Sequence, residues 1–221
     1  MPASTFWFDI ATDRAGTWIV ISRGSTNTAV STNNGTSWSA GGTAPSASLW
    51  QTLATDRNGH WMAVANATGT AATMVSSNNG TSWSSGGTMP TTAGTWASIV
   101  TDRKGNWLAF ATGATTTAIS TNNGTSWSAG GTGSISTVGA PYTVATDCKG
   151  AWIGISTSTT GNMYSLNNGA TWNNGGALPT SPWQALATDE HGNWVAISTT
   201  THTAVTTYSL INSNMLAVMG V

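Results

Sequence analysis

The chain has 221 residues, of which only 6% are charged, and six Lys and Arg against seven Asp and Glu give a formal net charge of −1. An average domain is about 25% charged, and nucleic-acid-binding domains carry a basic patch, so this composition argues against a nucleic-acid partner. No apolar run approaches the ~20 residues of a membrane-spanning helix, and no basic and then apolar leader opens the chain. We therefore expect neither membrane insertion nor a secretory signal, and the single cysteine excludes an internal disulfide framework.

The chain is built from five similar units that each begin with an aromatic residue. These residues are Trp7, Trp50, Trp96, Tyr142 and Trp183, at intervals of 41 to 46 residues. A repeat of about 20–50 residues indicates an architecture of stacked or radially arranged units. The predicted units cover residues 7–44, 50–90, 96–133, 142–178 and 183–221, which is nearly the whole chain.

Within a unit, the pattern of large residues predicts two strands joined by a tight turn. In the second unit, large and small residues alternate over residues 61–65, which is typical of a strand that is buried on both faces. The first strand is expected over residues 51–55, and an Asp-x-x-Gly turn joins the two strands. The Asp side chain of such a turn can accept hydrogen bonds from backbone N–H groups. The five turn aspartates are Asp13, Asp56, Asp102, Asp147 and Asp189.

Two further strands complete each unit. In the second unit they are expected over residues 72–76 and 82–84, joined by an Asn-Asn-Gly turn. A lone four-stranded sheet would expose two apolar faces, so the units must stack and close radially. The sequence therefore predicts an all-β fold, a five-bladed β-propeller with four antiparallel strands per blade. The last blade is expected to take its fourth strand from residues 215–221 rather than from the N-terminus, because only six residues precede Trp7.

The Asn-Asn-Gly turn belongs to a phrase that carries a family resemblance. Residues 31–38, 76–83, 120–127 and 165–172 share the pattern Ser-x-Asn-x-Gly-x-x-Trp. This pattern resembles the Asp-box of bacterial neuraminidase-type repeats, with Asn33, Asn78, Asn122 and Asn167 in place of Asp. The resemblance implies that these asparagines are structural residues of an outer turn and that the phrase by itself carries no activity. The tryptophan of each phrase is expected to pack between blades.

Charged residues and the leading aromatic residues fall at opposite rims of the predicted propeller. The turns between first and second strands hold 11 of the 13 formal charges, and we call this side the first-turn rim. The opposite side, the linker rim, is nearly neutral and rich in Thr, Ser and Gly, and irregular loops on a rigid scaffold commonly bind ligands. Aromatic residues there would offer a sugar flat apolar faces beside neutral hydrogen-bonding groups, whereas the alternative is that they pack between blades. The candidate carbohydrate-binding residues are Trp7, Trp50, Trp96, Tyr142 and Trp183.

The chain lacks the residue sets that common enzymes need. Glycoside hydrolysis uses two carboxyl groups across a cleft, and here the only acids outside the repeated turn aspartates are Asp9 and Glu190. The histidines lack a second ligand at metal-site spacing, so we expect no metal, no cofactor and no catalytic residues. Cys148 is expected to be a spectator thiol, mild activation beside Lys149 being the alternative. The three histidines are His60, His191 and His202.

Two classes of function remain, a binding module and a structural component. The near-identical units and the surface rich in Thr, Ser, Asn and Gly are similar to propellers of phage virion proteins. This resemblance implies a tail or capsid appendage, located on the virion, with other virion proteins as partners. We predict a non-enzymatic propeller that attaches to neutral host-surface glycans. The alternatives are a stand-alone lectin-like protein of the cytoplasm and a purely structural decoration protein without a ligand, and the oligomeric state is left open.

Overall fold

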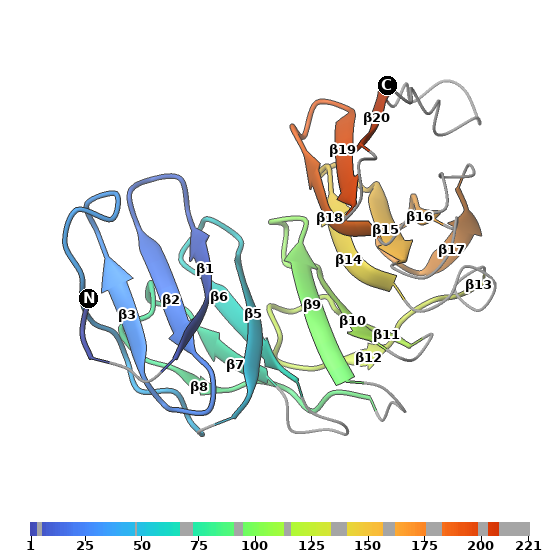
Figure 1. The fold of residues 1–221 in the computed structure, drawn as a ribbon. Helices are drawn as coiled ribbons and strands as arrows, with labels where there is room; N and C mark the ends of the chain where they lie inside the picture. Colours follow the sequence, from blue (N-terminus) through green and yellow to red (C-terminus); the bar gives the residue numbers. More distant parts are fainter. Residues whose placement is uncertain are drawn as a thin grey trace.

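The computed structural model describes residues 1–3, 6–46, 48–66, 73–90, 95–112, 116–133, 141–156, 162–175, 183–198 and 203–207. These residues form five β-sheets that follow one another around the molecule in chain order (Figure 1). None of the described residues belongs to a helix long and apolar enough to cross a membrane. The predicted all-β, five-bladed propeller with antiparallel blades is confirmed.

Each sheet is an antiparallel meander. The first contains β1 (Trp7–Thr12), β2 (Trp18–Ser22), β3 (Thr28–Ser31) and β4 (Ser39–Ala40). The second contains β5 (Trp50–Thr55), β6 (Trp61–Ala65), β7 (Thr73–Ser76) and β8 (Ser84–Ser85). The third contains β9 (Thr95–Thr101), β10 (Trp107–Thr112), β11 (Thr117–Ser120) and β12 (Ser128–Ala129). The fourth contains β14 (Pro141–Thr146), β15 (Trp152–Ser156), β16 (Asn162–Ser165) and β17 (Thr171–Asn174), and β13 (Thr132–Gly133) pairs in parallel beside β17. The fifth contains β18 (Trp183–Thr188), β19 (Asn193–Ser198) and β20 (Thr203–Thr207).

The start of each first strand is irregular in the same way. In the first sheet Trp7 pairs with Ser22 and Asp9 pairs with Ile21, so that one residue bulges between them. In the fourth sheet it is Pro141 that pairs with Ser156, the residue equivalent to Ser22. The residue equivalent to Trp7 is therefore Pro141, and the alignment that placed Tyr142 there is wrong by one position. The alignment followed aromatic character, and in the fourth unit the aromatic residue Tyr142 comes one position after the repeat position.

Successive sheets pack face to face through the large residues of their second strands. Ile19 and Ile21 of β2 are fully buried and belong to one cluster with Leu53 of the second sheet. The same contact recurs where Leu108 of β10 clusters with Val144 of the fourth sheet. We call the face that carries residues such as Ile19 the outgoing face of a blade, and the face that carries residues such as Leu53 its incoming face. Burying one side chain of this size contributes about 1.5–3 kcal/mol, so these contacts hold the blades together.

The last blade departs from this pattern. Ile10 on the incoming face of the first sheet is exposed, and so are Val195 and Ile197 on the outgoing face of the last sheet. The expected radial closure through these two faces is therefore absent from the described residues. The fifth unit also lacks the box phrase, and the fourth strand predicted at residues 215–221 lies outside the described residues. At the other end of the chain, Phe6 continues the edge of the first sheet, where its carbonyl oxygen accepts a hydrogen bond from Arg23 N at 2.9 Å.

The Asn-Asn-Gly turns are held by their own side chains. In the second blade, Asn78 Oδ1 accepts hydrogen bonds from Ser82 N at 2.9 Å and from Ser76 Oγ at 3.0 Å. Asn78 Nδ2 donates to Ser82 Oγ at 2.8 Å, and Gly80 N donates to Ser76 Oγ at 2.9 Å. Asn79 takes the left-handed conformation with φ of 54°. Equivalent contacts surround Asn33, Asn122 and Asn167.

We predict that Asn78→Ala lowers the free energy of unfolding by on the order of 1 kcal/mol, because it leaves Ser82 N without its acceptor. Asn78→Asp keeps the acceptor oxygen and should cost less. Urea denaturation of the three proteins measures both differences. Equal stability of Asn78→Ala and the unchanged chain would contradict the structural role of this side chain.

Glycine allows neighbouring blades to touch through their backbones. Each pair of glycines after a fourth strand donates one hydrogen bond to the box glycine of the next blade. A Cβ atom at Gly87 would lie 2.6 Å from the carbonyl oxygen of Thr125, a separation that no side chain tolerates. The three hydrogen bonds are Gly42 N to Gly80 O at 2.7 Å, Gly87 N to Gly124 O at 2.7 Å and Gly131 N to Gly169 O at 2.9 Å.

Gly87→Ala should therefore lower the free energy of unfolding by about 1–3 kcal/mol, the usual cost of overpacking. The exposed neighbour Ser85 offers a control, since Ser85→Ala should change stability by less than about 0.5 kcal/mol. Thermal unfolding followed by tryptophan fluorescence compares the two variants. A Gly87→Ala protein as stable as Ser85→Ala would show that the blades are not in contact here.

Candidate functional site

The turn aspartates organise the first-turn rim. Asp13 Oδ1 accepts hydrogen bonds from Ala15 N at 2.7 Å and Thr17 N at 2.9 Å. The same pair of bonds, to the second and fourth residues after the aspartate, forms at Asp56, Asp102, Asp147 and Asp189. These side chains therefore have the structural role in their own turns that the sequence pattern predicts.

The residue after each turn aspartate is held in a left-handed conformation, and its chemistry differs among the five turns. A threonine side chain fixes it, as where Arg103 N donates to Thr101 Oγ1 at 3.0 Å. The five residues, with their φ angles, are Arg14 (61°), Arg57 (64°), Arg103 (63°), Cys148 (58°) and Glu190 (65°).

Three of these five side chains converge on the carboxylate of a fourth, Glu190. Glu190 of the last blade receives Arg57 of the second blade at 2.9 Å and Arg14 of the first at 3.5 Å. Arg103 of the third blade makes a two-pronged contact with both carboxylate oxygens, one of them at 2.6 Å. Side chains from four blades can meet only near the propeller axis, so this axial cluster links the last blade to the first three. The sequence analysis placed these residues in repeated turns and missed their convergence.

The axial cluster fixes the charge of its members. The hydrogen bond from Arg103 and the charges of Arg103 and Arg57, against the opposing effect of burial, lower the pKa of Glu190 to about 2. Burial, followed by the neighbouring charge of Arg103, lowers the pKa of Arg57. At Cys148, burial raises the pKa of the thiol in spite of Arg103, and Sγ lies 3.9 Å from the carbonyl oxygen of Thr101. The raised pKa favours the spectator thiol over an activated cysteine at this position.

The low pKa of Glu190 predicts a specific pH dependence of stability. Because the pKa falls from 4.5 to about 2 on folding, its ion pairs stabilise the fold fully above about pH 4.5 and are lost as the pH falls toward 2. Glu190→Gln should therefore be less stable than the unchanged chain at pH 7, and the two should converge at low pH. Denaturant unfolding from pH 2 to pH 7 measures this difference, and a difference independent of pH would contradict the prediction.

The leading aromatic residues do not form an exposed ring. Trp50, Trp96 and Trp183 are 2%, 0% and 0% exposed, so they have no free face on which a sugar could stack. Trp7 is half-buried. The side chain of Tyr142 lies outside the described residues. Packing between blades, the alternative kept in the sequence analysis, accounts for the three buried tryptophans, and sugar binding at Trp7 stays a prediction.

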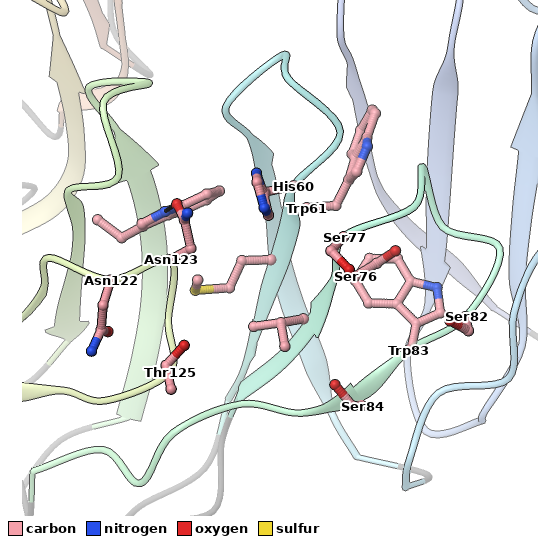
Figure 2. Close-up of a pocket in the computed structure, with 13 residues that line it drawn as sticks. His60, Trp61, Ser76, Ser77, Ser82, Trp83, Ser84, Asn122, Asn123 and Thr125 are labelled. Carbon is pink, nitrogen blue, oxygen red and sulfur yellow. Dashed lines mark hydrogen bonds between the residues drawn. The ribbon is translucent and has the colours of Figure 1, made fainter.

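A cavity of about 400 Å³ lies between the second and third blades, on the first-turn rim. Figure 2 shows His60, Ser77, Trp83 and Ser84 of the second blade facing Thr125 of the third. This volume lies within the range of small-molecule sites, about 300–1,000 Å³. The remaining lining residues are Trp61, Met62, Val75, Ser76, Ser82, Trp107, Asn122 and Asn123.

The lining of this interblade cavity is neutral apart from one histidine. His60 Nδ1 lies 2.8 Å from Asp56 Oδ2. In the third blade, Asn106 Nδ2 donates to Asp102 Oδ2 at 2.6 Å from the equivalent position, so His60 makes a contact that recurs in the turn of another blade. No cluster of three potential metal ligands occurs among the residues that the structure describes. The cavity therefore offers mainly hydroxyl and amide groups, because the lining residues Trp61 and Trp107 are 1% and 0% exposed.

Comparisons with known proteins give the fold and no family. No family model matches the chain, and no curated protein matches it. Among solved structures, YCF48 from Cyanidioschyzon merolae superposes with a TM-score of 0.71 at 12% identity, over 100% of this chain and 73% of that one. A structure of YCF48 bound to a D1 peptide gives 0.68 at 12% identity, over 98% and 69%.

A second group of similar structures consists of GH74 enzymes. The GH74 xyloglucanase from Xanthomonas campestris gives a TM-score of 0.67 at 15% identity, over 92% of this chain and 36% of that one. The GH74 enzyme from Niastella koreensis gives 0.58 at 19% identity, over 93% and 30%. This chain thus spans about a third of these enzymes, and identities this low establish the propeller fold alone.

Proposed function

We propose that the protein is a non-enzymatic binding propeller whose interblade cavity holds a neutral sugar. The observation that carries the proposal is the chemistry of the cavity lining. Exposed residues such as Ser77, Ser84 and Thr125 supply neutral hydrogen-bonding groups, and half-buried Val75 adds apolar surface. Sugars present C–H faces and hydroxyl groups together, and this combination complements them. Acidic sugars would call for Arg or Lys, which the lining lacks.

The acidic residues support a non-enzymatic role. A glycosidase needs one carboxyl group that is protonated at working pH and a second that is ionised. Glu190 is held ionised by three arginines, and its pKa of about 2 does not suit a general acid. Asp9 has a raised pKa because it is buried, but its Oδ2 accepts a hydrogen bond from Leu53 N at 2.7 Å, which makes it a link between the first two blades.

We further propose that the protein is a phage tail or capsid appendage that attaches to neutral host-surface glycans. Strict repetition and the nearly uncharged surface support it, since adhesion to a dense glycan layer tolerates weak single contacts. A decoration protein without a ligand is the structural alternative. A protein partner is a second candidate, because YCF48 was solved with a peptide and the axial cluster sets three arginines against one glutamate.

Filling the cavity tests the proposal without dismantling a turn. Ser84 is exposed in the short strand β8, and Ser84→Phe should occupy the cavity and weaken binding on a glycan array at least tenfold. Ser39 holds the same position in β4 of the first blade, so Ser39→Phe is the matched control and should leave binding unchanged.

Two outcomes would refute the sugar-binding proposal. One is an array on which the unchanged chain binds no neutral glycan at high protein concentration. The other is binding that survives Ser84→Phe while thermal unfolding shows both variants folded. The first outcome favours the structural alternative, and the second places the sugar elsewhere, with Trp7 as the remaining candidate.

A further inference from the structure

The outgoing face of the last blade is uncovered, although the same face is buried in every other blade. Val195 and Ile197 of β19 are 40% and 48% exposed. At the equivalent positions of β2, Ile19 and Ile21 are both 0% exposed. Ala185 and Ala187 of β18 pair with Ile197 and Val195, so they share this face, and both are exposed as well. The last blade thus presents four apolar side chains to solvent on one face.

The incoming face of the first blade is uncovered at its inner strand. Ile10 of β1 is 47% exposed, whereas Leu53, Ile99 and Val144 at equivalent positions are 6%, 3% and 4% exposed. Further out on this face Val20 is buried, so the exposed part centres on Ile10. In the second blade the equivalent residue, Leu53, clusters with Ile19 and Ile21, the large second-strand residues of the preceding blade.

The two uncovered faces are complementary to each other. Between the fourth and fifth blades, Ile155 of β15 clusters with Leu186 of β18, the residue equivalent to Ile10. Val195 and Ile197 can therefore pack on Ile10 in the geometry that successive blades already use within the chain. A net charge of only −1 places no strong repulsion between two such molecules.

We infer that the outgoing face of the last blade binds the incoming face of the first blade of a second copy of the chain. In the described residues Ile10 does not meet Val195 and Ile197, and closely packed interfaces between blades resist the rotation that would bring them together. The axial cluster adds to this resistance, because Glu190 is already tied to the first three blades. A second copy needs no rearrangement. The contact is heterologous, so a pair of copies still has one free incoming face and one free outgoing face. The inference does not depend on sugar binding.

Two charge-bearing substitutions test the inference. Ile197→Lys blocks the outgoing face and Ile10→Lys blocks the incoming face, and both sites are half-exposed, so the lysines should be tolerated. In sedimentation equilibrium the average mass of the unchanged chain should rise with concentration. Each variant alone should associate at least tenfold more weakly. Leu166→Lys is the control, because Leu166 is 52% exposed in the fourth blade, away from both faces, and its association should be unchanged.

Mixing the two variants gives the sharper result. Each variant retains the face that the other lacks, so an equimolar mixture should form a heterodimer and stop there. Two results would overturn the inference. One is an unchanged chain that stays monomeric at all concentrations. The other is slow hydrogen exchange of β19 in the dilute monomer, together with loss of this protection in Ile10→Lys or Ile197→Lys. That result would mean that the chain covers these faces itself. Thermal unfolding of each variant confirms that it is folded.

Discussion

The structure depends on one contact, in which large residues of one blade's second strand pack against the next blade. A strand turns alternate side chains to opposite faces, so β6 can present Met62 and Val64 to one neighbour and Ala63 to the other. Bulk on one face and a small residue on the other allow identical units to stack without a separate core. Burial of both faces leaves almost no position where a charged side chain could be hydrated. The low charge of the chain and its strict repetition follow from this constraint.

Close stacking determines where glycine and the polar side chains are placed. Backbones of adjacent blades meet at Gly42, Gly87 and Gly131, where a Cβ atom would collide with the neighbour. Polar side chains in the turns, such as Asp56 and Asn78, bond to their own backbone, so they satisfy local N–H groups without reaching across the surface. The linker rim is nearly neutral, whereas the first-turn rim carries 11 of the 13 formal charges, and its arginines Arg14, Arg57 and Arg103 pair with Glu190.

The periodicity of the sequence was sufficient to predict the blades, because alternation of large and small residues is a local signal. The unit boundary at Tyr142 was wrong because the alignment followed aromatic character, whereas the other leading residues lie six residues before the turn aspartate, which is Pro141 in the fourth unit. The sequence could not decide whether Trp96 is buried or exposed, because an aromatic residue at a strand start suits both packing between blades and stacking on a sugar. The meeting of Arg57 with Glu190 was also beyond local patterns, as it depends on how four blades bring their turns to one axis.

Within such a regular framework, the residues that break the repeat are the most informative, and each must be compared with its equivalents before a role is assigned. His60 beside Asp56 has the geometry of a catalytic pair, yet Asn106 makes the same contact in the next blade, so the pair is a turn contact. Glu190 has no counterpart with which to form a pair of carboxyl groups, because the equivalent positions of the other blades carry arginine or Cys148. Glu190 is stabilised by arginines from three other blades. The ionisation state of Glu190 therefore depends on how the blades are assembled. A substitution of Glu190 changes the contacts between blades before it changes a binding surface.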